Sequence, residues 1–435
     1  MTNERLTIVD IDNEGRGVAK QNEKVFFVYN ALPGETVEYK VLQKKKNVFF
    51  ATATSIFNTS TDRVIPRCPT YGICGGCSMQ HFNNEAQIKF KEDSFFKTLQ
   101  HIGSVKPNKI LEPIYLDFFE YRHKARLRAK YVPKKNKVLV GFNERLTHFL
   151  TDMNECSILP KKISLLLEPL KNLLINISIF NQIPQIEYAS NQDRDIFVLR
   201  ILDDLTNEDL KLLLAFEKDY EIEFWTQTKG PETVKPLFDE ERINLNYNLK
   251  SFGLIFKFEP TGFIQINPFI NEVLISKAVD LLNLNIKDVV LDFFCGLGNF
   301  SLPIAKKSES VIGFEGSQSL VDLANENALI NNLKNVSFQY QNLFDLKNFD
   351  LTRFQKATKW LIDPPRDGAY DLLKSIDEKN SPSIIVYVSC NPATLARDAN
   401  ILVNEKKYTL EMSGILNMFP NTSHIESISK FVLNE

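Results

Sequence analysis

The stretch Val289–Phe300, VVLDFFCGLGNF, runs from an apolar segment into a glycine-rich turn, and it decides the fold class of this chain. A short apolar run of this kind is typical of a strand buried on both faces, and the turn after it is typical of a helix start. Similar runs, separated by helical patterns, recur at Ser310–Glu315, Val336–Tyr340, Lys359–Ile362 and Ile384–Ser389. This alternation predicts a parallel α/β sheet within residues 256–435.

Each of the five predicted strands is followed by polar or glycine-rich residues. Open α/β sheets bind ligands beyond the carboxyl ends of their strands, so these positions form one candidate site. Its members are Phe294, Gly296, Gly298 and Asn299 after the first strand, Glu315 after the second, Asn342 after the third, Asp363 after the fourth and Cys390 after the fifth.

The glycines and the acid favour a nucleoside ligand without a pyrophosphate. Gly296 and Gly298 would allow the backbone to approach a ligand at a helix start. Glu315 lies 19 residues after Gly296, a spacing at which an acid commonly binds ribose hydroxyls. A nicotinamide dinucleotide would need a third glycine, and position 301 is Ser. S-adenosylmethionine fits, with the glycines at its methionine end, Glu315 at its ribose and Asn342 at its adenine.

Charge is distributed unevenly along the 435 residues, although the formal net charge is only −2. Residues 61–150 carry 16 basic and 8 acidic side chains, whereas residues 151–435 carry 28 and 39. Within the basic segment, charged and uncharged residues alternate with the period of a strand. One face of that strand would hold Arg122, Lys124, Arg126, Arg128 and Lys130. A charged edge strand that resists aggregation is the alternative, but five like charges favour binding to a polyanion such as RNA.

The first 58 residues consist of short β-rich runs separated by turn signals, which predicts a small β-barrel. Residues 59–255 are expected to form a central α+β domain. No run of about 18 apolar residues occurs and the first ten residues lack an apolar core, so we expect a cytoplasmic protein without a membrane span or secretory signal.

Four of the six cysteines are candidate metal ligands. Cys68, Cys74 and Cys77 follow C-x5-C-x2-C spacing, and Cys156 lies 79 residues after Cys77. Four thiolates can bind either tetrahedral zinc or an iron–sulfur cluster, and ligand number does not decide between them.

Three motifs in the last third of the chain, DFFCGLGNF (292–300), LIDPPRDGA (361–369) and YVSCNPATLARD (387–398), resemble the TrmA/RumA family of RNA uracil-C5 methyltransferases. The resemblance extends to CPTYGICGGCSMQH (68–81), which is similar to the iron–sulfur motif of the branch that modifies 23S rRNA. It implies an N-terminal TRAM-type barrel, a [4Fe–4S] cluster on the four cysteines and a C-terminal class I (Rossmann-like) methyltransferase domain that binds S-adenosylmethionine.

The resemblance also implies roles for individual residues. The pocket for cofactor and substrate would be lined by Gln265, Phe294, Asn299, Glu315, Asn342 and Asp363. The motif H-x-E at His424–Glu426 marks Glu426 as the general base. The substrate would be 23S rRNA or an assembling large ribosomal subunit particle, and no protein partner is evident.

Uracil C5 methylation requires one activated cysteine and one base. A thiolate that adds to C6 makes C5 nucleophilic, and a base later removes the C5 proton. Cys390, at a strand end before a probable helix start, is the expected nucleophile, and an exposed position there would lower its pKa. A cytosine-C5 enzyme would usually carry a cysteine in the segment Asp363-Pro364-Pro365, which has none. An N6-adenine enzyme would have an aromatic residue at 366 and no need of Cys390.

Two alternatives remain. The same chemistry could act on tRNA, in a tRNA uracil-C5 methyltransferase. A non-catalytic RNA-binding protein on a methyltransferase fold would have no reason to keep Cys390 and the glycines, and both are present.

Overall fold

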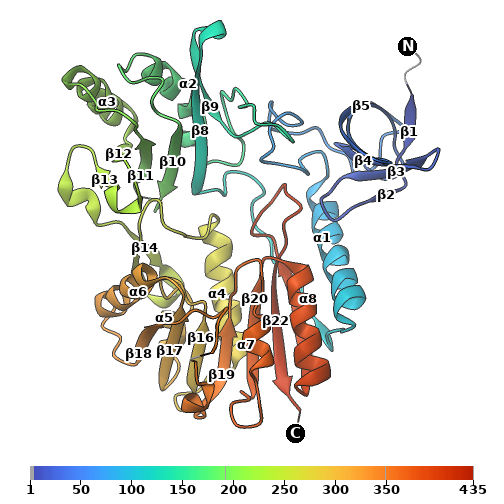
Figure 1. The fold of residues 1–435 in the computed structure, drawn as a ribbon, viewed down its shortest axis with the longest axis vertical. Helices are drawn as coiled ribbons and strands as arrows, with labels where there is room; N and C mark the ends of the chain where they lie inside the picture. Colours follow the sequence, from blue (N-terminus) through green and yellow to red (C-terminus); the bar gives the residue numbers. More distant parts are fainter. Residues whose placement is uncertain (1–3, 192, 348, 435) are drawn as a thin grey trace.

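The structure is a computed structural model that describes residues 4–191, 193–347 and 349–434 (Figure 1). In Figure 1 a small β-domain lies at the upper right, a mixed α/β domain lies at the upper left, and a larger α/β domain forms the lower half. Within the described ranges no helix has the length and apolar character needed to cross a bilayer.

The N-terminal sheet closes on itself. Its strands are β1 (Arg5–Thr7), β2 (Asp10–Ile11), β3 (Gly17–Gln21), β4 (Lys24–Tyr29), β5 (Thr36–Lys45) and β6 (Val48–Phe57), in the order β1-β5-β6-β4-β3-β2. The two edge strands, β1 and β2, are successive parts of one extended segment, which pairs with β5 at one end and β3 at the other. The edges therefore meet, as predicted for a barrel.

The central sheet has the order β13-β12-β11-β10-β8-β9. Its strands are β8 (Lys124–Val132), β9 (Lys137–Gly141), β10 (Gln185–Ser190), β11 (Asp195–Arg200), β12 (Glu223–Gln227) and β13 (Lys235–Pro236). Two amphipathic helices, α2 (Lys161–Ile175) and α3 (Asn207–Tyr220), pack their leucines against it. Thr206 caps α3 by accepting a hydrogen bond from the backbone N–H of Asp209.

The C-terminal sheet has the order β18-β17-β16-β19-β20-β22-β21-β7. Its strands are β7 (Lys109–Ile110), β16 (Val289–Phe293), β17 (Ser310–Glu315), β18 (Val336–Tyr340), β19 (Ala357–Ile362), β20 (Ile384–Ser389), β21 (Tyr408–Leu416) and β22 (Glu426–Leu433). The five strands β16 to β20 are parallel and lie where the sequence predicts them, within two residues. β22 is antiparallel to β20, so its first residue lies at the carboxyl edge of the parallel strands.

Helices cover both faces of this sheet, as expected for strands that are apolar on both sides. They are α1 (Asn84–Thr98), α4 (Pro268–Leu282), α5 (Ser301–Ala305), α6 (Gln318–Ile330), α7 (Tyr370–Lys374) and α8 (Pro392–Asn400). Two apolar cores result, one with α4, α5 and α6 and one with α1, α7 and α8. Short 3-10 or π-helical turns occupy Leu99–Gly103, Pro133–Lys135, Pro231–Thr233, Glu240–Ile243, Lys250–Phe252, Leu351–Phe354 and Ile401–Glu405.

The predicted central domain, residues 59–255, does not pack as one unit. Helix α1 lies beside α8 (Figure 1), and strand β7 pairs with β21. The hairpin of β14 (Asn246–Leu249) and β15 (Leu254–Lys257) packs on α6. Gln87 and Lys91 are buried polar residues within α1, so its sequence shows no continuous apolar face. Phe95 of α1 packs in the C-terminal core.

Candidate functional site

The turn after β16 is tightly wound. Phe294, Gly296 and Gly298 all have positive φ, at 64°, 55° and 93°. A Cβ atom on Gly298 would lie 2.6 Å from the side chain of Leu302, so no larger residue fits there without a shift. The left-handed backbone of Phe294 is strained for a bulky residue, and such strain is concentrated at functional sites.

Glu315 at the end of β17 ties this turn to the neighbouring strand. Its carboxylate accepts hydrogen bonds from the backbone N–H groups of Gly296 (3.1 Å) and Ser317 (3.0 Å). A carboxylate has about four acceptor positions, so two remain for ligand hydroxyls. Asn342 is exposed after β18, and its side chain accepts from the N–H of Phe344, whose ring lies 5.6 Å from that of Phe294.

Asn299 and Gln265 lie in different settings. The Asn299 side-chain oxygen accepts from Tyr247 and Asn271, both at 3.2 Å, and its amide nitrogen donates to Asn271 at 3.0 Å. Asn299 therefore links the turn to β14 and α4. Gln265 is half-buried just before α4, and its side-chain amide forms no hydrogen bond with the residues the structure describes. It remains available to a ligand.

Cys390 and Glu426 meet at the carboxyl edge of the sheet. Cys390 follows β20 and Glu426 opens β22, and the preceding pair in the ladder is Ser389 with Ser427. Asp363 follows β19, the next strand along. Cys390 is half-buried, and Glu426 is 3% exposed. The sequence prediction therefore named three residues that the topology brings to one place.

The electrostatics of this group differ from the prediction for Cys390. Burial, then the negative charges of Glu426 and Asp363, raise the pKa of its thiol to about 11, although Arg366 opposes them. The expected lowering of this pKa is wrong, because Cys390 is half-buried rather than exposed and two acids lie near its thiol. Burial raises the pKa of Asp363 to about 7, and burial with the charge of Asp363 raises that of Glu426 well above its ordinary value.

Two residues near this site were missed by the sequence analysis. Asp292 in β16 is fully buried, and burial raises its pKa to about 8. Ser301 donates to one of its carboxylate oxygens, and the other has no hydrogen-bond partner in the described structure. An acid within the apolar run VVLDF was the available signal. Arg366 was noted only as a non-aromatic residue, and its role as the positive charge near Cys390 depends on the folding of the turn.

We expect alkylation of Cys390 in the free protein to accelerate about tenfold per pH unit between pH 7 and 9, because only the thiolate reacts and the thiol pKa lies above this range. Iodoacetamide labelling followed by mass spectrometry of the peptide containing Cys390 measures this rate. A rate that does not change with pH would contradict the raised pKa.

The basic strand is β8, and its alternation is as predicted. Ala125, Leu127 and Ala129 are buried, whereas Arg126, Arg128 and Lys130 are exposed.

The prediction of five free charges on that face is wrong for part of the set. Arg122 lies before the strand and is half-buried, with its guanidinium donating to the carbonyl of Lys124. The Lys124 ammonium donates to the carbonyl of Gly262, and burial lowers its pKa to about 8. Arg126 pairs with Glu187 at 3.0 Å. Lys124 and Arg126 are therefore bound by a neighbouring loop and strand. Sequence periodicity does not reveal either partner.

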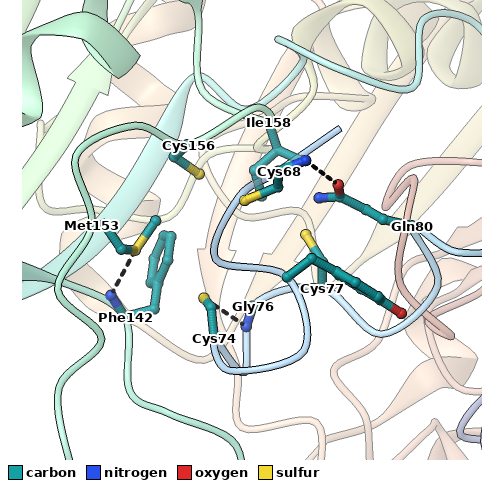
Figure 2. A pocket seen from close by; sticks show the side chains of 10 residues that line it. Cys68, Cys74, Gly76, Cys77, Gln80, Phe142, Met153, Cys156 and Ile158 are labelled. Atoms are coloured by element: carbon teal, nitrogen blue, oxygen red, sulfur yellow. Dashed lines mark hydrogen bonds between the residues drawn. The ribbon is translucent and has the colours of Figure 1, made fainter. Parts of the chain in front are cut away.

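Cys68, Cys74, Cys77 and Cys156 line one small cavity, together with Phe142, Met153 and Ile158 (Figure 2). Gln80 accepts a hydrogen bond from the N–H of Cys68 at 3.0 Å, and the N–H of Gly76 donates to the sulfur of Cys74 at 3.3 Å. Burial, then neighbouring thiols, raises the pKa of Cys77 to about 12, and burial raises that of Cys156 to about 12.

Across residues 4–191, 193–347 and 349–434, no group of three or more His, Cys, Asp or Glu side chains is arranged to hold a metal ion. The four cysteines line a common cavity.

Nearly the whole chain is similar in sequence to known methyltransferases. The family described as tRNA (Uracil-5-)-methyltransferase matches residues 84–432. A protein of Chromobacterium violaceum named 23S rRNA (uracil(1939)-C(5))-methyltransferase is 44% identical over 430 residues, which cover 98% of this chain and 84% of that one. A protein of the same name from Nitrosospira multiformis is 43% identical over 428 residues, 98% of each chain.

Among solved structures, the tRNA (uracil-54, C5)-methyltransferase of Pyrococcus abyssi in complex with S-adenosyl-L-homocysteine is similar in fold. The TM-score is 0.73, with 21% sequence identity, 99% of this chain covered and 100% of that one.

Proposed function

The chain belongs to the tRNA (uracil-5-)-methyltransferase family, and we propose that it methylates C5 of a uridine in 23S rRNA, with S-adenosylmethionine as methyl donor. The observation that carries this proposal is the placement of Cys390 beside Glu426 across β20 and β22. A nucleophilic thiol and a buried carboxyl group at the ligand-binding edge are what C5 methylation of uracil requires.

In this proposal Cys390 is the nucleophile. Its thiolate adds to C6 of a uracil that has been flipped out of its RNA stack, and the electron pair shifts toward C5. C5 then takes the methyl group, Glu426 removes the remaining C5 proton, and the Cys390 sulfur leaves C6 to restore the ring. Gln265 and Asp363 have side chains without hydrogen-bond partners in the described structure, so they are the groups available to the uracil edge.

The turn after β16 fits S-adenosylmethionine, which supplies an electrophilic methyl group when bound. An added Cβ on Gly296 would meet nothing within 4 Å, so this backbone is open to a ligand. Glu315 retains free acceptor positions for ribose hydroxyls, and Asn342 is exposed for an adenine. Phe294 lies beside them, and Asn299 holds the far end of the turn.

We assign residues 1–58, whose described part forms the barrel, as a TRAM-type RNA-binding module, and the exposed side chains of β8 as a second RNA contact. Arg128 and Lys130 would contact phosphates, and Arg126 contributes less because Glu187 neutralises it. Arg122 and Lys124 would act by holding the strand near Gly262. A ribosomal RNA substrate would place the protein in the cytoplasm.

The test is to incubate the purified protein with labelled S-adenosylmethionine and unmodified 23S rRNA, 16S rRNA or tRNA in parallel, and to map 5-methyluridine by mass spectrometry. Label on 23S rRNA alone is expected. Label on tRNA would favour the second candidate, a tRNA enzyme with the same catalytic residues, which the fold of the Pyrococcus abyssi protein also accommodates. Binding to 23S rRNA without label on any RNA or ribosomal particle would favour a non-catalytic RNA-binding protein.

We also propose that Cys68, Cys74, Cys77 and Cys156 hold a [4Fe–4S] cluster. All four thiols line one cavity, and this is what supports a common site for them. Four thiolates could hold either zinc or a cluster, and the likeness of the segment CPTYGICGGCSMQH (68–81) to an iron–sulfur motif favours the cluster. The proposed methylation is redox-neutral, so the cluster would have a structural role.

Protein purified without oxygen is expected to be brown and to contain iron and acid-labile sulfide in equal amounts. Replacing Cys156 with Ala should abolish both, because it removes one of four ligands. Elemental analysis and visible absorbance measure this. Colourless protein that carries zinc would refute the cluster and leave the methyltransferase proposal standing.

A further inference from the structure

The loop from Asn417 to Ile425 joins β21 to β22 and leads directly into Glu426. It has no regular secondary structure, yet most of it is buried, and Asn417, Met418 and Asn421 are at most 1% exposed. Loops usually lie at the surface because buried backbone groups need hydrogen-bond partners. Here the partners come from three segments far upstream in the sequence.

Asn421 is the centre of these contacts. Its carbonyl oxygen accepts hydrogen bonds from the backbone N–H groups of Ser78 and Met79, both at 3.0 Å. Its own N–H donates to the side chain of Gln87 at 3.1 Å, and its side-chain amide donates to the carbonyl of Phe118. Asn421 has φ of 63°, a left-handed conformation that Asn tolerates better than most residues.

Further bonds fix the rest of the loop. The ammonium of Lys91, which is 1% exposed, donates to the Asn417 side chain at 2.7 Å and to the Phe419 carbonyl at 3.0 Å. The Tyr121 hydroxyl donates to the carbonyl of Pro420 at 2.9 Å. The N–H of Ser423 donates to the Ser78 hydroxyl at 3.2 Å.

This network connects the cysteine cavity with the carboxyl edge of the sheet, where Cys390 and Glu426 lie. Ser78 and Met79 directly follow Cys77, whose side chain lines the cavity. The Cys77 carbonyl accepts from Arg145 at 2.8 Å, so its segment is held from both sides. Glu426 lies five residues after Asn421, and its carboxyl group forms no hydrogen bond with the described part of the chain. Its position is therefore set by its backbone and by the loop before it.

We propose that Asn421 is a positioning residue through which the four-cysteine centre fixes the Glu426 carboxyl group. The inference rests on the proposed function, because it takes Glu426 as the base that removes the C5 proton. In this proposal the cysteines contribute to catalysis without redox chemistry. They fix the backbone of Ser78 and Met79, whose N–H groups bind the carbonyl of Asn421 in the loop.

The first test is N421D, which keeps the size of the side chain and its acceptor oxygen but loses the donor to Phe118. A misplaced base slows proton removal, so turnover on RNA should fall by about 10- to 100-fold. The first methyl transfer should persist, and a methylated RNA–protein adduct should accumulate on denaturing gels. S78A loses only the hydrogen bond to Ser423. It should also show slower turnover with continued adduct formation, to a smaller degree.

N335D is the matched control. Asn335 also donates its amide to buried carbonyls, at Ala305 and Ser308, but at the amino ends of β17 and β18. It should lose stability without adduct accumulation. Wild-type turnover in N421D, or equal losses of adduct and turnover, would overturn the proposal. Absence of 5-methyluridine with the wild-type protein would instead refute the proposed function.

The second test does not depend on activity. In C77A the exchange of backbone amide hydrogens in the full-length protein should accelerate in residues 417–425 as well as in residues 68–80, while β17 remains unchanged. Mass spectrometry of peptic fragments measures this. Unchanged exchange in residues 417–425 would overturn the link, whatever metal the cysteines bind.

Discussion

Replacing Cys390 with alanine is expected to abolish RNA methylation, with a loss on the order of 10⁴-fold or more, because the proposed mechanism requires this sulfur to add to C6 of uracil. Covalent adducts with RNA that contains 5-fluorouridine should also disappear, since the adduct is a bond to this sulfur. Turnover is measured with labelled S-adenosylmethionine, and adducts are measured on denaturing gels.

Cys295 provides the control for this experiment. It is the other thiol at this end of the sheet, but it is 5% exposed and lies between the glycine turn and Gly313. Burial raises its pKa well above the ordinary value, so it is a poor nucleophile. C295A should therefore still form adducts. Residual methylation in C390A above one hundredth of the wild-type rate would mean that another residue attacks the uracil.

The parallel strands could be predicted because they are buried on both faces and so appear as continuous apolar runs. Ser310–Glu315 and Ile384–Ser389 have the predicted bounds in the structure. The sites at their ends followed from topology alone, since the carboxyl ends of parallel strands share one edge. Glu426 could not be placed in this way. It lies on an antiparallel strand, and only the family resemblance distinguished it from other acids.

The contacts between distant segments could not be predicted either. Lys91 and Gln87 are polar side chains of α1, yet they are buried against the loop before β22. Arg126 reads as a free charge, yet Glu187 on β10 pairs with it. In each case the partner lies more than 60 residues away in the sequence, and periodicity reports only which residues share a face.

The raised pKa values of Glu426 and Asp363 bear on the order of events at the site. Burial raises the pKa of both groups, and the charge of Asp363 raises that of Glu426 further. Positive charge on a bound sulfonium would favour their ionisation before methyl transfer, which leaves a neutral thioether, and the proposed removal of the C5 proton comes after that step. Since the base must be deprotonated, release of methylated RNA should slow as pH falls.

E426Q is accordingly expected to separate methyl transfer from product release. Glutamine keeps the size of the side chain but cannot take the C5 proton, so turnover should fall by about 10²- to 10⁴-fold. Cys390 remains free to attack, and one methyl group per protein should be transferred into a covalent RNA adduct that persists. Labelled methyl groups retained on the protein band of a denaturing gel measure this adduct.

E411Q on the same hairpin is the matched control. Glu411 forms a 2.8 Å ion pair with Lys430, and it lies several residues along β21 from Leu416, the residue that pairs with Glu426. It should turn over at close to the wild-type rate and leave no adduct. If E426Q also releases its product at the wild-type rate, the base must be another group, and Asp363 is the acid nearest in the sheet to take that role. If E426Q forms no adduct at all, Glu426 acts before methyl transfer, by accepting the proton of Cys390.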